Sequence, residues 1–376
     1  MRIYLSRPDI TEKEVQAVTE VLRGPNLSLG PKLPEFENAF AKYIGRKHAV
    51  AVNSGTSGLF LCMSALDIGQ ADEVITTPFT FIATSNVIMM TGAKPVFVDI
   101  DPVTMNIDAD KIERRITKKT KAIMPVEVFG NPAGFDKICR IADKHKLTVI
   151  EDSCEALGSA LNGKKAGEFG KMSVFAFYPN KQITTREGGM ILTDDDNLAD
   201  MCLSLRNQGR GKSGAWLSHE RLGYNYRLSD INCALGLVQL SRIEEIKVKR
   251  KQVAKWYQEN LAGDDRFIVP TEPAGCDINW FVFVVRLADR FTRQHRDKVL
   301  QTMRDAGIQV SNYFSPVHLQ PFMVEQFGYK PGDFPVTEFV AERTIALPFY
   351  NNLSKPEVAI VCDELRKAVS RLRYVV

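Results

Sequence analysis

Three short stretches of the chain carry residue types that can act together in chemistry. The first is NSGTSG at 53–58, which follows the apolar run HAVAV and precedes the helical run LFLCMSAL. Glycines and small hydroxyl residues at a helix N-terminus leave backbone N–H groups free for a phosphate, and the helix dipole attracts its negative charge. The stretch matches neither the Walker spacing nor the GxGxxG spacing. An ordinary helix cap is therefore the alternative interpretation.

The second stretch ends in a carboxylate. Asp152 closes the apolar run LTVIED, and ligands bind at the carboxyl ends of strands in open parallel sheets. At that place a carboxylate can hold a metal, orient a histidine, cap the next helix or keep a proton on a pyridine nitrogen. The residue alone does not decide among these roles.

The third stretch offers an amine. Lys181 follows Pro179 in FAFYPNKQITTREGGMILT, in a turn between two apolar runs, although many loop lysines only face the solvent. The three stretches together supply a phosphate cradle, a carboxylate for a ring nitrogen and an amine for an aldehyde, which are the parts that a pyridoxal phosphate site requires. Because each stretch follows a strand, we expect them to meet in one crevice.

Short apolar runs separated by helical stretches predict the fold that positions these residues. From about residue 48 the runs are HAVAV, DEVITT, PVFVDI, KAIMPV, LTVIED, SVFAF and GMILT. Strands that are apolar throughout are typical of a sheet covered on both faces. The pattern therefore predicts an α/β fold with a mostly parallel central sheet.

Helical patterns flank these strands. Thr11 and Glu14 form a capping box, and Val15, Val18 and Leu22 recur at helical spacing before Gly24, which predicts an amphipathic helix outside the sheet. After Leu228 a long helical pattern runs through SDINCALGLVQLSRIEEIKVKRKQVAKWYQENL.

The remaining chain predicts a second, smaller unit. It contains the strand run WFVFVVRL, a helix, and a closing helix capped by Ser354 with Pro356 in its first turn. We therefore expect a large domain at 1–250, which includes the N-terminal helix, and a small α+β domain at 251–376. The boundary falls inside the long helix, so the two should be rigidly joined.

The composition of the whole chain excludes several classes of protein. The 49 basic and 45 acidic residues are mixed along the chain and leave a formal charge of only +4, which argues against nucleic acid as a partner. The seven cysteines are scattered without a CxxC pair, which argues against a disulfide framework or a zinc site. No stretch reaches the roughly 20 apolar residues that span a bilayer, and no signal peptide opens the chain. A cytoplasmic protein is expected.

The chain resembles the DegT/DnrJ/EryC1/StrS family of sugar aminotransferases over nearly its whole length. The resemblance rests on blocks in the family's order and spacing: SRPDI, NSGTSGL, PFTFIAT, KPVFVDID, VFGNPAGF, VIEDSCEALGS, FYPNKQITTREGGM, GYNYRLSDINCALGLVQL and SPVHLQP. It implies the fold type I architecture of aspartate aminotransferase, with pyridoxal 5'-phosphate as cofactor.

The resemblance also implies roles for single residues. Lys181 would carry the cofactor as a Schiff base, and Asp152 would pair with its pyridinium nitrogen. The other residues implied at the cofactor are Gly55, Thr56 and Ser57 on the phosphate, Phe81 stacked on the ring, Glu155 near the ring, and Asn225 reaching the phosphate across a subunit interface. Asn225 thus implies a homodimer with shared active sites. His318 in SPVHLQP falls in the substrate-side loop.

Three residues depart from the family's pattern. Ala176 stands where many members have a serine that bonds the phosphate, so one phosphate contact is missing or moved. Glu155 replaces a commoner glutamine or histidine and adds a negative charge beside the cofactor. Arg186 replaces a frequent glycine, and it either alters the turn after Lys181 or compensates the charge of Glu155.

The resemblance implies transfer of an amino group from glutamate or glutamine to a nucleotide-linked keto-deoxy sugar. Arg206, Arg210 and Lys212 either meet a diphosphate of that substrate or form a solvated loop. A sugar dehydratase of the same family is an alternative, but it keeps a histidine in place of Lys181. A cofactor-binding regulatory protein would have lost the lysine or Asp152, whereas a cyclitol aminotransferase would share every residue named.

Overall fold

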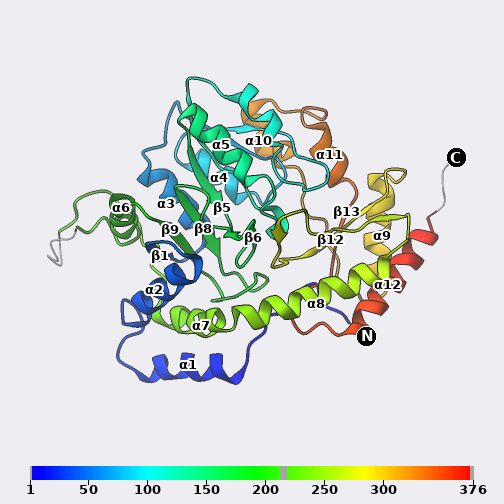
Figure 1. Cartoon of the computed structure of the whole chain (residues 1–376), viewed down its shortest axis with the longest axis horizontal. Helices are drawn as coiled ribbons and strands as arrows, with labels where there is room; N and C mark the ends of the chain where they lie inside the picture. Colours follow the sequence, from blue (N-terminus) through cyan, green and yellow to red (C-terminus); the bar gives the residue numbers. More distant parts are fainter. Residues whose placement is uncertain (1, 212–217, 373–376) are drawn as a thin grey trace.

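The computed structural model describes residues 2–211 and 218–372 and centres on a seven-stranded sheet. The strand order is β1-β9-β8-β5-β4-β2-β3, and every strand is parallel to the others except β9, which is antiparallel to both neighbours (Figure 1). Each apolar run forms one strand, so the predicted mostly parallel sheet is confirmed. The bounds are β1 His48–Val52, β2 Glu73–Thr76, β3 Lys94–Phe97, β4 Thr120–Ile123, β5 Thr148–Asp152, β8 Met172–Ala176 and β9 Gly189–Thr193.

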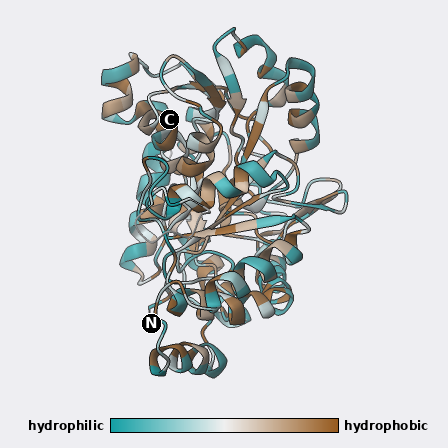
Figure 2. Ribbon diagram, turned by 90° about the vertical axis from the view of Figure 1, so that its left-hand side faces the viewer, coloured by the Kyte–Doolittle hydropathy of each residue, from teal (hydrophilic) through white to brown (hydrophobic). Residues whose placement is uncertain are grey.

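Both faces of this sheet are covered, which explains why its strands are apolar throughout. Val50 and Val52 of β1 point into a cluster with α3, α4 and α6. Ala51 between them points into another cluster with α2 and α7. Alternate residues of one strand therefore pack into two different hydrophobic cores, one on each face of the sheet. Figure 2 shows hydrophobic residues concentrated along the strands inside the molecule.

The helices around the sheet begin where their sequences provide caps. Thr11 and Glu14 make the predicted capping box of α1, and Ser54 caps α3 by accepting the backbone N–H of Ser57. The bounds are α1 Glu12–Arg23, α2 Lys32–Ile44, α3 Gly55–Ala65, α4 Ala83–Met90, α5 Phe135–His145 and α6 Asp196–Arg206, with short 3₁₀ turns η1 Ala109–Lys111, η2 Glu113–Arg115 and η3 Val128–Gly130.

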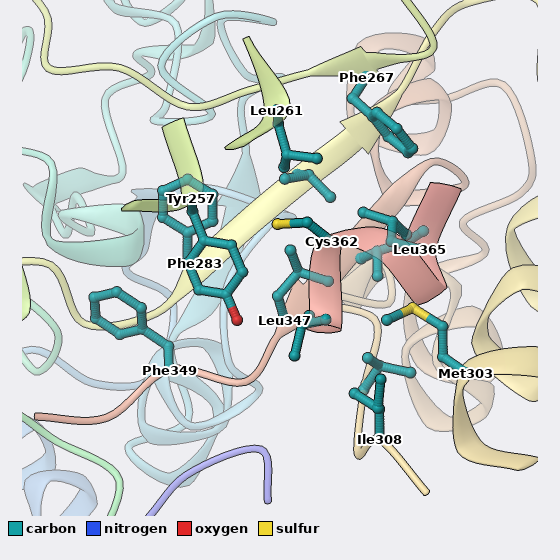
Figure 3. Close-up of a cluster of buried hydrophobic side chains, with 14 of the residues drawn as sticks. Tyr257, Leu261, Phe267, Phe283, Met303, Ile308, Leu347, Phe349, Cys362 and Leu365 are labelled. Carbon is teal, nitrogen blue, oxygen red and sulfur yellow. The ribbon is translucent and has the colours of Figure 1, made fainter. Parts of the chain in front are cut away.

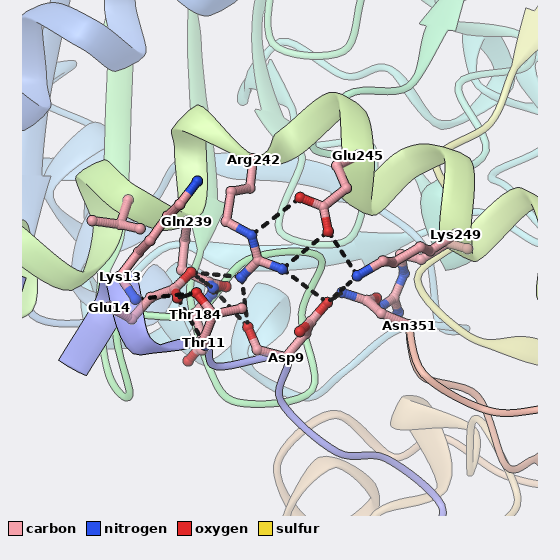
Figure 4. A network of polar contacts seen from close by, with 12 residues as sticks. Asp9, Thr11, Lys13, Glu14, Thr184, Gln239, Arg242, Glu245, Lys249 and Asn351 are labelled. Carbon is pink, nitrogen blue, oxygen red and sulfur yellow. Dashed lines mark hydrogen bonds and ion pairs between the residues drawn. The ribbon is translucent and has the colours of Figure 1, made fainter. Parts of the chain in front are cut away.

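The long helical pattern after Leu228 is broken in the structure. It forms α7 (Asp230–Ser241) and α8 (Ile243–Leu261), with Arg242 between them, so the prediction of one continuous helix was wrong. Arg242 forms ion pairs with Glu14 at 2.7 Å and with Asp9 at 3.2 Å (Figure 4). These partners lie more than 200 residues away in the sequence, so the local pattern could not reveal the break.

The second core lies beyond the start of α8. Buried side chains of α8, β12, β13, α9 and α12 pack together there, with Tyr257 stacked on Phe283 at a centroid distance of 4.8 Å (Figure 3). The bounds are β10 Phe267–Ile268, β12 Phe283–Leu287 and β13 Thr344–Leu347 in one sheet, α9 Arg293–Asp305, η4 Val317–Leu319, α10 Pro321–Phe327, α11 Pro335–Ala341 and α12 Lys355–Ser370. The expected strand WFVFVVRL and the Ser354-capped closing helix are confirmed.

A small third sheet connects the two regions. Its strands are β11 Cys276–Asp277, β6 Ala160–Leu161 and β7 Lys164–Lys165. The predicted domain boundary between residues 250 and 251 lies within α8, and it stays a prediction. No helix in the described ranges is long and apolar enough to cross a membrane.

Candidate active site

A cavity of about 570 Å³ lies at the carboxyl ends of β5 and β8, where the sequence predicted a crevice. Its lining includes Gly55 and Thr56 of α3, Asp152 of β5, and Lys181 from the turn after β8. The three stretches that could serve a pyridoxal phosphate site therefore converge in the folded chain.

The N-terminus of α3 forms one wall of the cavity. The Ser54 hydroxyl accepts the Ser57 N–H at 3.0 Å, while the N–H groups of Gly55 and Thr56 belong to the first helical turn, which has no acceptor within the helix. A Cβ on Gly55 would lie 2.8 Å from the Cβ of Ala176 and 2.9 Å from the Sγ of Cys154. Only glycine fits there.

Asp152 is buried at the end of β5 with its carboxylate held from two sides. The Thr84 hydroxyl donates to its Oδ2 at 2.7 Å, and the Cys154 N–H donates to its Oδ1 at 3.3 Å. These two hydrogen bonds fix the orientation of the Asp152 carboxylate in the wall of the cavity. Thr84 closes the block PFTFIAT, but no local pattern in the sequence marks it as a partner of Asp152.

Lys181 extends its amine to the centre of a small group of side chains. Its Nζ lies 3.7 Å from Oε1 of Glu155 and 4.0 Å from the centroid of the Phe281 ring. Its backbone N–H donates to the carbonyl of Tyr178 at 2.9 Å, which closes the turn. Phe281 lies 100 residues further along the chain, and no motif marks it.

Glu155, one of the three residues that depart from the family's pattern, is buried. Its Oε2 accepts the N–H of Phe129 at 2.8 Å. Burial raises the pKa of Glu155 above its usual range, and the amine of Lys181 is the strongest influence against that rise. Lys181 is therefore the basic group beside this carboxyl.

Arg186 instead shapes the turn. Its side chain is exposed, and its φ of 72° lies in the left-handed region that favours glycine. Its N–H donates to the Thr184 hydroxyl at 2.9 Å. Of the two explanations left open by the sequence, this geometry supports a role in the turn, because the side chain is directed to solvent and away from Glu155.

Several other predicted residues lie in different environments. Phe81 lines the cavity and is 62% exposed. Ser57 is buried below the helix start, where its hydroxyl donates to Asn53 at 2.6 Å, and Asn225 is an exposed residue; neither belongs to the lining of this single chain.

His318 is not brought to the cavity. It has no exposed surface, its Nε2 lies 3.0 Å from Glu338, and its ring packs against Phe334. Burial lowers its pKa, while Glu338 opposes that effect. A fully buried side chain offers no surface to a substrate, so this geometry does not support the substrate-side role.

The basic residues considered for a diphosphate also differ from the expectation. Arg206 is buried and forms an ion pair with Glu37 and a hydrogen bond of 2.6 Å to the carbonyl of Ala51. It is therefore neither a free phosphate ligand nor part of a solvated loop. Lys212 lies outside the described residues.

Comparison with known proteins identifies the family to which the chain belongs. The model of the DegT/DnrJ/EryC1/StrS aminotransferase family matches residues 8–366. GDP-perosamine synthase of Caulobacter vibrioides is 41% identical over 85% of this chain and 86% of its own.

Solved structures agree over the whole chain. PseC of Helicobacter pylori, an aminotransferase involved in the biosynthesis of pseudoaminic acid, has a TM-score of 0.94 and 29% identity over 99% of this chain and 100% of its own. Spr1654 of Streptococcus pneumoniae, solved in a PLP form, has a TM-score of 0.94 and 28% identity over 99% of both chains.

These matches confirm the fold type I architecture and the dependence on pyridoxal phosphate. The residues of the cavity fit that cofactor: first-turn N–H groups, a buried carboxylate and an amine face a space of suitable size. The chain belongs to the DegT/DnrJ/EryC1/StrS aminotransferase family and is a pyridoxal phosphate-dependent sugar aminotransferase.

Proposed function

We propose that this enzyme moves an amino group from glutamate or glutamine to a keto-deoxy sugar linked to a nucleotide, with Lys181 as the residue that bonds the cofactor. The observation that carries this proposal is the convergence of Lys181, Asp152 and the N-terminus of α3 on one cavity. The name of the Caulobacter relative, GDP-perosamine synthase, supports a nucleotide-linked sugar as the class of acceptor.

Each group in the cavity has a distinct task in this reaction. Bound pyridoxal phosphate supplies an aldehyde carbon that exchanges amines and a ring that accepts electrons. Asp152, held by Thr84, would keep a proton on the ring nitrogen. The first-turn N–H groups of Gly55 and Thr56 would bind the phosphate at the positive end of the helix dipole.

Lys181 acts twice. Its Nζ would bond the cofactor and give up that place to the amino donor. The freed neutral amine would take the proton from the substrate carbon and return it to the cofactor, so it would serve as base and acid in turn. Phe81 forms the aromatic wall of the cavity, where it would lie against the ring.

The active unit in this proposal is a homodimer. Leu27, Leu29 and Leu222 are 47%, 50% and 80% exposed. The carbonyl of Leu27 accepts the N–H of Asp230 at 3.1 Å, so the 27–29 segment lies beside the chain that follows Asn225. Burial of these apolar side chains against a second copy would bring Asn225 to the neighbouring subunit's phosphate.

The absorption spectrum of the purified protein tests the role of Lys181. We expect pyridoxal phosphate to give a visible band that glutamate or glutamine converts to the pyridoxamine form, and Lys181→Ala to abolish the original band. Candidate nucleotide-linked keto sugars should then restore the band in the wild type.

Either of two results would count against the proposal. A protein that binds the cofactor but converts it with no amino donor is not a transaminase. A converted protein that is restored by a keto cyclitol but by no nucleotide-linked sugar has a different acceptor.

A further inference from the structure

The turn that carries Lys181 is fixed at its base to the end of β8. The Lys181 N–H donates to the carbonyl of Tyr178 at 2.9 Å, and the Thr185 N–H donates to the carbonyl of Phe177 at 3.0 Å. These hydrogen bonds close the turn, but they do not attach it to the opposite wall of the cavity. The position of the Lys181 amine across the cavity therefore depends on what else the turn contacts.

Gln182, the residue next to Lys181, makes such a contact. Its side chain is 3% exposed, and its amide nitrogen donates to the backbone carbonyls of Glu155 and of Asn279, the latter at 3.0 Å. Because both neighbours are acceptors, the nitrogen of the amide and not its oxygen must face them. One side chain thus joins the lysine turn to two segments that are distant in the sequence.

These two segments are the ones that face the amine of Lys181. The loop after β5 presents Glu155, whose Oε1 lies 3.7 Å from the lysine Nζ. The segment that contains Asn279 continues to Phe281, whose ring centroid lies 4.0 Å from Nζ. Gln182 therefore sets the place of the lysine relative to both neighbours of its amine.

The two acceptors of the Gln182 amide are themselves firmly placed. The Asn279 N–H donates to the Ser159 hydroxyl at 2.9 Å, and the Asn279 side chain donates to the carbonyl of Leu157 at 2.8 Å. A Cβ at residue Gly130 would lie 2.9 Å from the carbonyl oxygen of Glu155 and 3.1 Å from that of Asn279. Both carbonyls therefore lie close together in a tightly packed place.

We propose that Gln182 is a positioning residue, which links the lysine turn to the two facing segments and thereby holds the Lys181 amine where its reaction with the cofactor requires it. The inference rests on the proposed role of Lys181 and extends it to a residue that does not itself line the cavity. Such a contact matters because a shift of about 1 Å in a reacting group costs about 100-fold in rate.

Gln182→Met tests the inference, since methionine has a similar length but donates no hydrogen bond. It should weaken pyridoxal phosphate binding about tenfold, because the misplaced amine bonds the cofactor less well. Conversion of the visible band by the amino donor should slow about 100-fold, while the donor concentration that gives half the maximal rate stays the same. Isothermal titration calorimetry and stopped-flow absorption measure these quantities.

The Lys181→Ala background shows whether Gln182 acts through the lysine. In that background Gln182→Met should leave the affinity for pyridoxal phosphate unchanged, because no amine is present to be positioned. An equal loss of affinity in both backgrounds would mean that Gln182 only supports the cavity wall, which would overturn the inference. An unchanged affinity and rate in the presence of Lys181 would overturn it as well.

Tyr257→Phe is the matched control for the loss of a buried hydrogen bond. Tyr257 lies in the second core with no exposed surface, and its hydroxyl donates to the carbonyl of Pro348 at 2.7 Å. Tyr257→Phe should lower the free energy of unfolding in urea without changing the cofactor affinity or the rate of conversion. Changes as large as those of Gln182→Met would show a general effect of lost stability and contradict the positioning role.

A second variant covers the case in which Gln182→Met does not fold. Gln182→Glu at about pH 6 keeps its proton because burial disfavours the charged carboxylate. Its carboxyl group can donate to one of the two carbonyls, so affinity and rate should change in the same direction but less. Wild-type affinity and rate in this variant would count against the inference.

The same measurements separate this inference from the proposed function. If the wild type shows no visible band and Lys181→Ala does not alter pyridoxal phosphate affinity, the role of Lys181 itself fails. If the band is present and depends on Lys181, but Gln182→Met changes neither affinity nor rate, only the role of Gln182 fails.

Discussion

Glu127 is a buried acid directly behind the strand end that carries Asp152. Its N–H donates to the Asp152 carbonyl at 3.4 Å, and its two side-chain oxygens are buried without a hydrogen-bond donor in the described chain. Burial, and then the neighbouring carboxyl of Glu151, raise the pKa of Glu127 well above its usual range. Glu151 accepts the N–H of Gly167 at 2.8 Å, which favours its charged form, so the form that keeps its proton is favoured at Glu127.

This proton makes the stability of the protein depend on pH. A carboxyl with a raised pKa in the folded state stabilises that state below its unfolded value of 4.5, and the contribution is lost as pH rises through the folded value. Glu127→Gln cannot lose a proton, so its free energy of unfolding should fall less between pH 5 and pH 9, by up to about 1.4 kcal/mol per pH unit.

Urea denaturation at several pH values measures this difference. The exposed carboxyl of Glu20 provides the control, because Glu20→Gln should keep the wild-type pH profile. A Glu127→Gln profile parallel to that of the wild type would show that Glu127 is not the group that titrates.

A substitution at Ala176 tests whether this protein lacks a hydrogen bond to the phosphate of its cofactor. It lines the cavity beside Gly55 at the start of α3, where the family commonly has a serine. A hydroxyl at this position can donate to the phosphate, and a hydrogen bond to a charged group contributes about 1.5 kcal/mol or more. Ala176→Ser should therefore tighten pyridoxal phosphate binding about tenfold in equilibrium titration. Weaker binding would mean that the wall at Ala176 has no room for the hydroxyl.

At the scale of elements, α8 supports the site through Arg250. This buried guanidinium donates to the carbonyls of Trp280 at 2.5 Å and Phe281 at 2.6 Å, and to the side chain of Asn351 at 2.7 Å. It thus fixes the segment that presents the Phe281 ring to Lys181. Asn351 in turn donates to Asp9 of the network around Arg242.

Arg250→Met should destabilise the protein because it leaves three buried acceptors unpaired. Each buried acceptor left without a donor costs about 1 to 3 kcal/mol, and denaturant unfolding measures the total. Lys255→Met on the same helix is the control, since Lys255 is 67% exposed and its 3.9 Å pair with Glu259 contributes at most about 1 kcal/mol. If Arg250→Met lowers the free energy of unfolding by less than Lys255→Met does, α8 does not hold the 280–281 segment.

The elements that the sequence predicted correctly are those defined by their own residues. The seven apolar runs, the capping box at Thr11 and the helix cap at Ser354 depend on neighbours within a few positions, and all are present. The break at Arg242 and the burial of Arg206 depend on distant carboxylates, which a local pattern cannot show.

The residues of the candidate site also divide into those that a local pattern marks and those that only the folded chain brings together. Lys181, Asp152 and Gly55 could be found because each follows a strand that is clear in the sequence. Phe281 contacts Lys181 only after the two regions of the chain pack together, so its place in the cavity could not be predicted. His318 lies in a recognisable block, but its burial against Phe334 is a property of the folded core.

At the scale of the whole molecule, one chain leaves apolar side chains exposed both at the cavity and on α1. Phe81 lines the cavity at 62% exposure, and Val15 and Leu22 of α1 are 48% and 56% exposed although the helix packs against α7. The predicted amphipathic face of α1 therefore does not fill the core of its own chain. A second copy that covers these residues would bury them and complete the cavity.

Hybrid dimers test whether Asn225 acts across that interface. Lys181→Ala and Asn225→Ala chains, each expected to lose most activity alone, are co-expressed and purified together. If Asn225 serves the neighbouring site, every hybrid has one site with both defects and one with neither. Random pairing makes half of the dimers hybrids, so activity should return to about a quarter of the wild-type value. If Asn225 serves its own chain, each site of the hybrid keeps one defect, and co-expression should restore no activity.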